Sequence, residues 1–349
     1  MRLLFDLGHP AHVHLFRNLI KRVMQEGGKV LAATREKDVT VELCQAYKIP
    51  QIILSRANRG GVLAGARELL SRSFKLFRVA RNFKPDALIG TSASIGTVGR
   101  VTGCPSFVFN EDDASAVPLF AKIAYPACSY IVTPECLKHE NYGKRQLTYP
   151  GYHELAYLHP DHFTPDPDVP RSIGLELDMP YFILRFVALK AHHDSDAGGL
   201  PLEGAIRLVN LLTSKGRVLI TAEEELHAEF KDYSFPLPPD QLHDVLAFAS
   251  MYIGDSQTVA AEAAVLGVPS FRCNTFVERI SYLDELEKRY DLTKGFLPDQ
   301  IDSLIDTVEN VLMNLEKGKW NIQHSRQKML EKCTNVADWQ WQMLCDKLH

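Results

Sequence analysis

The sequence lacks long hydrophobic runs, an excess of one charge and any closely spaced pair of cysteines. No apolar stretch approaches the roughly 20 residues that a membrane-spanning helix needs, and residues 1–6 enter a strand-like pattern without the basic region or cleavage site of a secretion signal. Lys and Arg number 39 against 43 Asp and Glu, which leaves no global basic field for nucleic acid. Seven cysteines, an odd number, indicate reduced thiols. We therefore expect a cytoplasmic protein that binds no nucleic acid.

Composition and pattern predict a folded α/β protein. The chain has 349 residues, of which 46% are hydrophobic and 23% charged, as in ordinary globular proteins. Short apolar runs alternate with longer amphipathic segments, which is typical of βαβ units in a doubly wound parallel sheet. The predicted strands are residues 2–7, 29–33, 51–54, 87–89, 106–109, 130–132 and 147–150, followed by 181–186, 217–221, 251–253 and 270–272.

A proline-rich stretch divides the chain. Prolines stand at 160, 165, 167, 170 and 180, and little apolar periodicity survives between them. The strand and helix pattern then restarts, with helices predicted over 202–214, 239–249, 259–266, 304–315 and 323–348. We expect one domain over residues 1–160, a second over 171–325, and a C-terminal helical segment over 326–349.

The loops that follow the predicted strands are the candidate sites, because open parallel sheets bind ligands at the carboxyl ends of their strands. The first such loop contains Gly8, His9, His12 and His14. The helix that starts here offers free N–H groups to an anion, and a neutral His12, nearest the first turn, could accept a proton. Alternatively, the histidines cap and pack the helix start. No carboxylate or cysteine accompanies them at ligand spacing, so we expect no metal.

Two further loops of the first half carry polar groups. Gly90-Thr91-Ser92 offers small hydroxyl side chains that could line a pocket, although an ordinary turn explains it equally well. In the acidic loop 110–113, Asp112 and Asp113 can cap the next helix and favour its dipole. Glu111, nearest the strand end, is the candidate for orienting a sugar hydroxyl or acting as a base.

The most specific loop is residues 254–258, with the sequence Gly-Asp-Ser-Gln-Thr, followed by an Ala-rich helix. Asp255, Ser256 and Thr258 can cap this helix, and its start can hold a diphosphate through N–H groups. Glu262 lies four positions after Thr258 on the same helix face, where a carboxylate could accept two hydrogen bonds from a ribose diol. If it is buried, it needs a partner.

The first predicted strand of the second domain, residues 181–186, and the loop after it contain cations that we expect near this candidate site. Arg185 ends the first strand of the second domain and could offset diphosphate charge. The next loop contains Lys190, His192, His193 and Asp194, which we expect near the same ligand.

Residues 56–84 form a basic amphipathic segment in an otherwise acidic chain. Its cations, Arg56, Arg59, Arg67, Arg72, Lys75, Arg78, Arg81 and Lys84, face one acid, Glu68. The segment could rest on anionic lipid at the inner face of the membrane. A core helix with a solvated basic face is the alternative, and RNA binding is a weaker third one.

Three segments resemble a known family. Residues 5–16 (FDLGHPAHVHLF), the loop 110–113 and the block 254–269 are similar to the domain of unknown function 354 family, a GT-B-like family akin to GT-B glycosyltransferases and UDP-N-acetylglucosamine 2-epimerases. The resemblance covers nearly the whole chain. It implies two Rossmann-like domains facing across a cleft, a C-terminal domain that binds the nucleotide sugar, and a last helix that packs back toward the N-terminal domain.

The resemblance also implies roles for particular residues. Ser256, Gln257 and Thr258 would lie near diphosphate, and Glu262 near ribose. His12 matches the histidine in the first loop of the lipid-linked N-acetylglucosaminyltransferase of peptidoglycan synthesis, although Pro10 and Ala11 replace the glycine pair of that loop.

The epimerases supply a competing hypothesis. Glu111 matches one of their catalytic acids, but His9 stands where their first loop has an arginine, and Gly90-Thr91-Ser92 lacks the acid that should follow the glycine. Because an epimerase needs a set of acid and base groups around the sugar, transfer is favoured.

We therefore expect a glycosyltransferase of cell-envelope polysaccharide biosynthesis that needs no metal or cofactor. It would move a sugar from a nucleoside diphosphate sugar, UDP-linked, to a glycan or lipid-linked acceptor, with His12 or Glu111 taking the acceptor proton. A protein that binds nucleotide sugars or glycans without catalysis is the third hypothesis.

Overall fold

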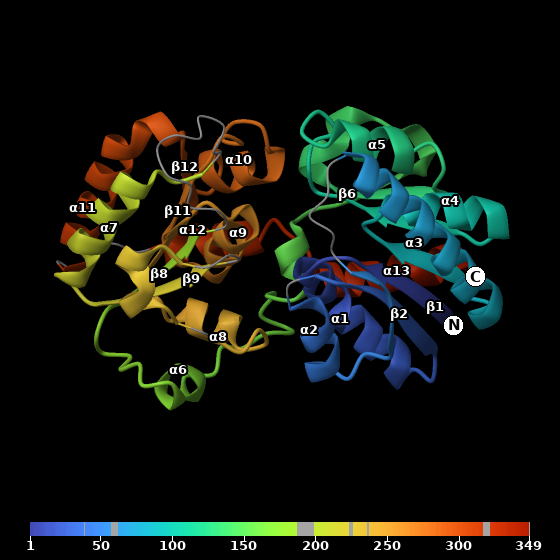
Figure 1. Cartoon of the computed structure of the whole chain (residues 1–349), viewed down its shortest axis with the longest axis horizontal. Helices are drawn as coiled ribbons and strands as arrows, with labels where there is room; N and C mark the ends of the chain where they lie inside the picture. Colours follow the sequence, from blue (N-terminus) through green and yellow to red (C-terminus); the bar gives the residue numbers. More distant parts are fainter. Residues whose placement is uncertain are drawn as a thin grey trace. The chain divides into compact units, whose positions relative to one another are not determined.

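The computed structural model describes residues 1–37, 39–56, 62–186, 199–222, 226–235, 237–316 and 322–348 (Figure 1). The chain forms two compact units, Met1–Phe163 with Cys333–His349, and Thr164–Lys332. Each unit is built on its own parallel sheet, which confirms the α/β class. Within the described ranges, no helix is both long enough and apolar enough to cross a bilayer.

The first unit holds a seven-stranded sheet in the order β3-β2-β1-β4-β5-β6-β7. Its strands are β1 (Arg2–Leu7), β2 (Lys29–Glu36), β3 (Gln51–Arg56), β4 (Ala87–Gly90), β5 (Ser106–Phe109), β6 (Tyr130–Pro134) and β7 (Gln146–Tyr149). Its helices are α1 (Pro10–Gln25), α2 (Thr40–Ala46), α3 (Val62–Phe83), α4 (Ala93–Thr102), α5 (Pro118–Ala124) and α13 (Val336–Leu348), with the 3-10 helices η1 (Glu135–Glu140), η2 (Gly143–Arg145) and η3 (His153–Ala156). All seven strands predicted in this half are present.

Burial on both faces explains the apolar strands of this sheet. Every residue of β4 and β5 is buried. On one face, Leu4, Leu88 and Val108 pack against Leu76 of α3 and Val98 of α4. The central strands therefore hold their polar carboxyl-terminal loops on a rigid support.

The second unit holds a five-stranded sheet in the order β12-β11-β10-β8-β9. Its strands are β8 (Tyr181–Phe186), β9 (Arg217–Ala222), β10 (Met251–Gly254), β11 (Ser270–Cys273) and β12 (Thr293–Phe296). Its helices are α6 (Asp168–Ser172), α7 (Leu202–Thr213), α8 (Leu242–Ala247), α9 (Gln257–Leu266), α10 (Ser281–Lys288), α11 (Ile301–Glu316) and α12 (Gln323–Leu330), with η4 (Ala228–Tyr233) and η5 (Pro298–Gln300).

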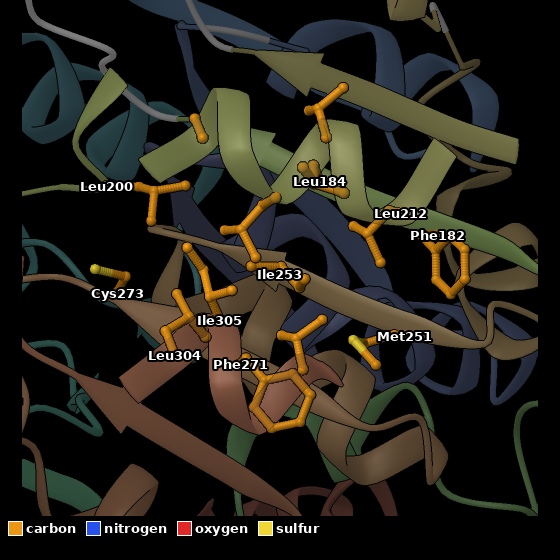
Figure 2. Packing of buried hydrophobic residues seen from close by; sticks show 14 of the residues in the cluster. Phe182, Leu184, Leu200, Leu212, Met251, Ile253, Phe271, Cys273, Leu304 and Ile305 are labelled. Carbon is orange, nitrogen blue, oxygen red and sulfur yellow. The ribbon is translucent and has the colours of Figure 1, made fainter. Parts of the chain in front are cut away.

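Figure 2 shows the hydrophobic core of the second unit. Strands β8, β10 and β11 and helices α7 and α11 contribute many of its side chains, among them Phe182, Leu184, Met251, Ile253, Phe271, Leu212, Leu304 and Ile305. The edge strand β12 was not predicted, because Lys294 and Gly295 interrupt its apolar pattern and only Thr293 and Phe296 are buried.

The C-terminal segment divides between the two units. The sequence predicted one helix over 323–348, but α12 ends at Leu330 and α13 starts at Val336. Helix α12 packs on α9 in the second unit, where Arg326 Nε donates to Val265 O at 2.9 Å. Helix α13 packs on α1 in the first unit, where Arg22 pairs with Asp338 at 2.7 Å (Figure 1, red beside blue). Residues 326–332 therefore belong to the second unit, and not to one terminal segment over 326–349.

Candidate functional site

Each sheet has a topological switch point, where the chain connections leave in opposite directions. In the first unit it lies between β1 and β4, and in the second between β8 and β10. Open α/β sheets bind ligands beyond the carboxyl ends of the strands at such points. The candidate residues Gly8, His12 and Ser92 follow the first pair of strands, and Arg185 and Ser256 lie at the ends of the second pair.

The first loop is held by its own histidines. His9 is the N-cap of α1, and its Nδ1 accepts the Ala11 N–H at 3.2 Å. His12 Nδ1 accepts the Gly8 N–H at 3.2 Å, and Thr91 Oγ1, from the loop after β4, lies 2.7 Å from Nδ1 and 2.8 Å from Nε2. A Cβ placed on Gly8 would meet no atom within 4 Å. The structure thus brings Gly8, His9, His12 and Thr91 together.

His12 is neutral at physiological pH. Burial, together with the smaller effects of His9 and His153, holds the pKa of His12 well below its ordinary value. A backbone N–H can only donate, so the Nδ1 that accepts from Gly8 carries no proton, and the single ring proton is on Nε2. The Thr91 hydroxyl lies within hydrogen-bond distance of both ring nitrogens.

His14 lies apart from this group. It is buried, its Nδ1 is 3.3 Å from Arg17 Nη1, and its ring stacks on Tyr157 at 5.3 Å and meets the edge of Tyr47 at 5.9 Å. For this histidine the packing interpretation holds, and we do not retain it as a ligand.

Ser92 is held by a hydrogen bond to a buried ion pair. The Asp6 carboxylate, 1% exposed, accepts hydrogen bonds from Ser92 Oγ and from the Arg72 guanidinium of α3. Gly90 is required at the end of β4, because a Cβ there would lie 2.5 Å from Asp6 O. Ser92 therefore supports the loop that carries Thr91.

Glu111, two residues after β5, contacts a histidine that the sequence analysis overlooked. Its Oε2 lies 3.2 Å from Nδ1 of His153, the first residue of η3. Burial lowers the pKa of His153 to about 4, against the smaller opposing effects of Glu154 and Asp112. Burial raises the pKa of Asp112 beside them. Polar groups that follow β5 and belong to η3 thus lie, like those that follow β1 and β4, at the carboxyl ends of the strands of this sheet.

In the second unit, the expected capping of α9 by a residue of the loop 254–258 is present. Ser256 is the N-cap, and its Oγ accepts the Val259 N–H at 3.5 Å. The first N–H groups of a helix have no carbonyl partner within it, and Ser256, Gln257 and Thr258 are only half-buried. Asp255 is buried behind them, and its backbone oxygen accepts from Asn274 Nδ2 at 3.1 Å.

Glu262 is buried one turn deeper, with an exposed fraction of 3%. The partner that a buried carboxylate requires is His243 of α8, whose Nε2 lies 3.0 Å from Oε1. The structure thus places Glu262 in the interior, one turn behind the half-buried start of α9.

Arg185 stands between neighbouring strand ends of the sheet. In the register of the sheet it is level with Gly254 on β10 and with Thr221 on β9, and its Nη1 donates to Thr221 Oγ1 at 3.4 Å. Lys190, His192, His193 and Asp194 lie outside the described residues.

One group among the described residues could offer three ligand atoms to a metal ion: Asp113, His139 and Glu140. Glu140 already accepts from the Ala114 N–H at 2.5 Å and from the Tyr142 hydroxyl at 2.9 Å. None of the candidate site residues belongs to this group, and we assign no metal to it.

The basic segment is helix α3, apart from its first residues, of which 57–61 are not described. Arg72 is not on its surface: it is buried, and besides Asp6 it binds Ser55 Oγ at 3.1 Å and the carbonyl oxygens of Ala33 and Thr34. Leu70 and Phe74 are instead 73% and 62% exposed, one turn apart on the helix. The exposed Arg67, Arg78 and Arg81 continue this stripe at helical spacing.

The two units define a GT-B-like fold. The chain has the fold of a UDP-GlcNAc 2-epimerase from Neisseria meningitidis, solved bound to UDP-GlcNAc (TM-score 0.62, 12% identity, covering 95% of this chain and 99% of that one). It is equally similar to the spinosyn rhamnosyltransferase SpnG (TM-score 0.63, 14% identity, 95% of each chain). Enzymes that epimerise and enzymes that transfer sugars thus share this fold.

The particular family follows from the sequence. The chain belongs to the family described as "Protein of unknown function (DUF354)", whose model matches residues 1–338. An uncharacterized protein of Methanocaldococcus jannaschii is 23% identical over 345 residues, which cover 88% of this chain and 97% of that protein. The resemblance inferred from residues 5–16, 110–113 and 254–269 is confirmed.

Proposed function

We propose that the protein is a glycosyltransferase that takes a sugar from a UDP-linked donor and moves it to a glycan or lipid-linked acceptor. The observation that carries the proposal is the start of α9. Half-buried Gln257 and Thr258 follow the N-cap Ser256 at the switch point of the second sheet. Their N–H groups and the helix dipole favour a diphosphate.

Two charged residues complete the proposed donor site. Arg185, level with Gly254 in the sheet, offsets diphosphate charge as the bond to the sugar breaks. Glu262 accepts from the ribose diol, and His243 holds its carboxylate in place at 3.0 Å. The acceptor belongs to the first unit, where Gly8, His9, His12 and Glu111 supply polar groups at the carboxyl ends of β1 and β5.

Epimerisation is the second candidate. It is favoured by the loop 110–113, in which Glu111 matches a catalytic acid of the epimerases, and by the fold shared with the UDP-GlcNAc 2-epimerase. The contacts after β4 favour transfer. The side chains of Thr91 and Ser92 are hydroxyl groups, so neither position supplies a carboxylic acid that could donate a proton to a sugar. Both hydroxyl groups are already hydrogen-bonded within the protein, Thr91 to His12 and Ser92 to Asp6. Asp6 itself is bound to Arg72.

Incubation with a panel of UDP-sugars and glycan or polyprenol acceptors tests the proposal. Transfer requires UDP release that depends on the acceptor. A C2 epimer formed without acceptor would establish the epimerase instead, and binding of UDP-sugars without turnover would establish a binding protein.

Matched arginine variants locate the donor site. Arg185→Met should lower turnover at least tenfold. Arg217→Met changes an arginine at the other end of the same sheet, which donates to Gly174 O at 2.7 Å, and should leave turnover unchanged.

We further propose that α3 brings the first unit to an anionic lipid surface, where a lipid-linked acceptor resides. Leu70 and Phe74 would enter the interface while Arg67, Arg78 and Arg81 contact lipid phosphates. Flotation with phosphatidylglycerol vesicles should lose signal in Phe74→Glu. Leu119→Glu on α5 is the control, since Leu119 is 67% exposed. Equal flotation of Phe74→Glu and wild type would reject the membrane contact.

A further inference from the structure

Two buried side chains hold the peptide groups that lead into helix α9. Asn274 Nδ2 donates to Asp255 O at 3.1 Å. Tyr252 Oη donates to Ser256 O at 3.3 Å. Both side chains are buried, with exposed fractions of 3% and 0%, and all four residues belong to the second unit. The two consecutive carbonyl groups before the helix are therefore turned toward the interior of this unit.

The contacts of Asn274 fix the orientation of its side-chain amide. Asn274 follows β11, where its backbone N–H donates to Phe296 O at 3.1 Å. Its Oδ1 accepts the Phe276 N–H at 2.9 Å. If the amide were rotated by half a turn, its oxygen would face the Asp255 carbonyl and its NH₂ group would face the Phe276 N–H, so both hydrogen bonds would be lost. The group that meets the Asp255 carbonyl is therefore the NH₂ donor.

Glycine at position 254 makes room for the Tyr252 hydroxyl. A Cβ on Gly254 would lie 2.6 Å from Tyr252 Oη and even closer to Arg185 O. The Asp255 N–H donates to the same Arg185 carbonyl at 3.3 Å. A side chain at 254 would therefore displace two groups that hold the loop after β10, which explains why this loop begins with glycine.

The planarity of the peptide bond then sets the direction of two N–H groups. In a trans peptide the C=O of one residue and the N–H of the next point in opposite directions, and no described peptide bond is cis. Because the Asp255 carbonyl is turned toward Asn274, the Ser256 N–H is turned away from it. Because the Ser256 carbonyl is turned toward Tyr252, the Gln257 N–H is turned away from that side chain. Within the described part of the chain, neither N–H donates to another group.

We infer that Asn274 and Tyr252 are positioning residues that turn two backbone N–H groups toward the diphosphate of a bound nucleotide. Asn274 presents the N–H of Ser256, and Tyr252 presents that of Gln257. This inference rests on the proposed function, and it adds the Ser256 N–H to the donors of Gln257 and Thr258. Because both side chains are buried, neither touches the ligand, and each acts only through the backbone.

Amide NMR of the deuterated, ¹⁵N-labelled full chain with UDP tests the direction of each N–H group. Saturation with UDP should move the N–H proton signals of Ser256 and Gln257 downfield in the wild type, because a hydrogen bond to phosphate deshields the proton. In Asn274→Ala the shift of Ser256 should become much smaller while that of Gln257 is kept. Asn274→Asp keeps the acceptor for the Phe276 N–H but lacks the donor, so it should reduce the Ser256 shift in the same way. Wild-type shifts in both variants, or equal losses at Ser256 and Gln257, would overturn the inference.

Tyr252→Phe makes the complementary change and keeps the aromatic ring in the core. It removes the hydroxyl donor from Ser256 O, which still accepts the Ala260 N–H at 3.2 Å. The Gln257 shift should therefore become smaller without vanishing, whereas the Ser256 shift should stay at its wild-type value. A wild-type Gln257 shift in Tyr252→Phe would overturn the role of Tyr252.

Isothermal titration with UDP measures the contribution of each side chain to binding. The Kd should rise roughly three- to tenfold in Asn274→Ala and about two- to threefold in Tyr252→Phe, because each N–H group remains but is less well directed. Asn310→Ala, at an exposed position of α11, is the control and should keep the wild-type Kd. Absence of UDP binding by the wild type would overturn the proposed function together with this inference. Binding by the wild type with an unchanged Kd in Asn274→Ala would overturn the inference alone.

Discussion

Replacement of Arg72 by Met tests the buried ion pair beneath the first loop. Asp6 is almost completely enclosed, and Arg72 and Ser92 are its side-chain donors. Removing one partner of a buried pair costs about 3–5 kcal/mol, because the remaining charge is left without compensation. Arg72 also gives up its bonds to Ala33 O, Thr34 O and Ser55 Oγ, so we expect the upper part of this range, about 4–5 kcal/mol.

Thermal unfolding followed by circular dichroism measures this loss. In a unit of this size 1 kcal/mol corresponds to about 2–4 °C, so the Tm of the first unit should fall by roughly 8–20 °C. Arg78→Met, at an exposed position of the same helix, should change the stability by no more than about 0.5 kcal/mol. Adding Asp6→Asn to Arg72→Met should recover part of the loss, because the unpaired charge is removed. Equal Tm values for Arg72→Met and Arg78→Met would refute the reasoning.

Two further predictions concern the first unit. Gly8→Ala should leave the unfolding free energy unchanged or raise it by up to about 1 kcal/mol, since the added methyl meets no atom within 4 Å. Because we expect substrate to approach the backbone at Gly8, kcat/KM should nevertheless fall at least tenfold. Full activity of Gly8→Ala would contradict this. Burial lowers the pKa of His153 from 6.5 to about 4, so between these values the unfolded chain binds a proton that the folded chain does not. The lowered pKa of His153 therefore makes its full contribution to the free energy of unfolding above pH 6.5. This contribution is lost as the pH falls toward 4, and at pH 5 it has decreased by about 2 kcal/mol. Urea midpoints at pH 7 and pH 5 should therefore lie closer together in His153→Gln than in wild type, and equal separations would contradict the assignment.

The sequence predicted the strands and strand-end loops, because buried parallel strands are continuous apolar runs bounded by turns. Strands β1, β5 and β8 match their predicted ranges, whereas β12 is too short and too polar to be recognised. The break in the terminal helix was missed because the sequence around it contains no proline or glycine.

The partners of the site residues could not be predicted from local pattern. In the sequence, Arg72 is one of several cations on a basic helix, and its hydrogen bond to Asp6 forms only in the folded structure. His153 and His243 each reach a glutamate from another element of their own unit, and no sequence spacing encodes such contacts. His153 was overlooked because it lies in the short 3-10 helix η3, outside the strand-end loops that the sequence marked as candidate sites.

Isothermal titration of two proline variants tests most directly whether UDP binds at the start of α9. Proline suits the first position of a helix and removes its N–H, so Gln257→Pro deletes one proposed phosphate donor with little change to the fold. Ser281→Pro makes the same change at the first position of α10. Loss of one hydrogen bond to a charged group is worth about 1.5–3 kcal/mol, so the Kd for UDP should rise roughly 10- to 100-fold in Gln257→Pro and stay at the wild-type value in Ser281→Pro. Wild-type affinity in Gln257→Pro would contradict the account.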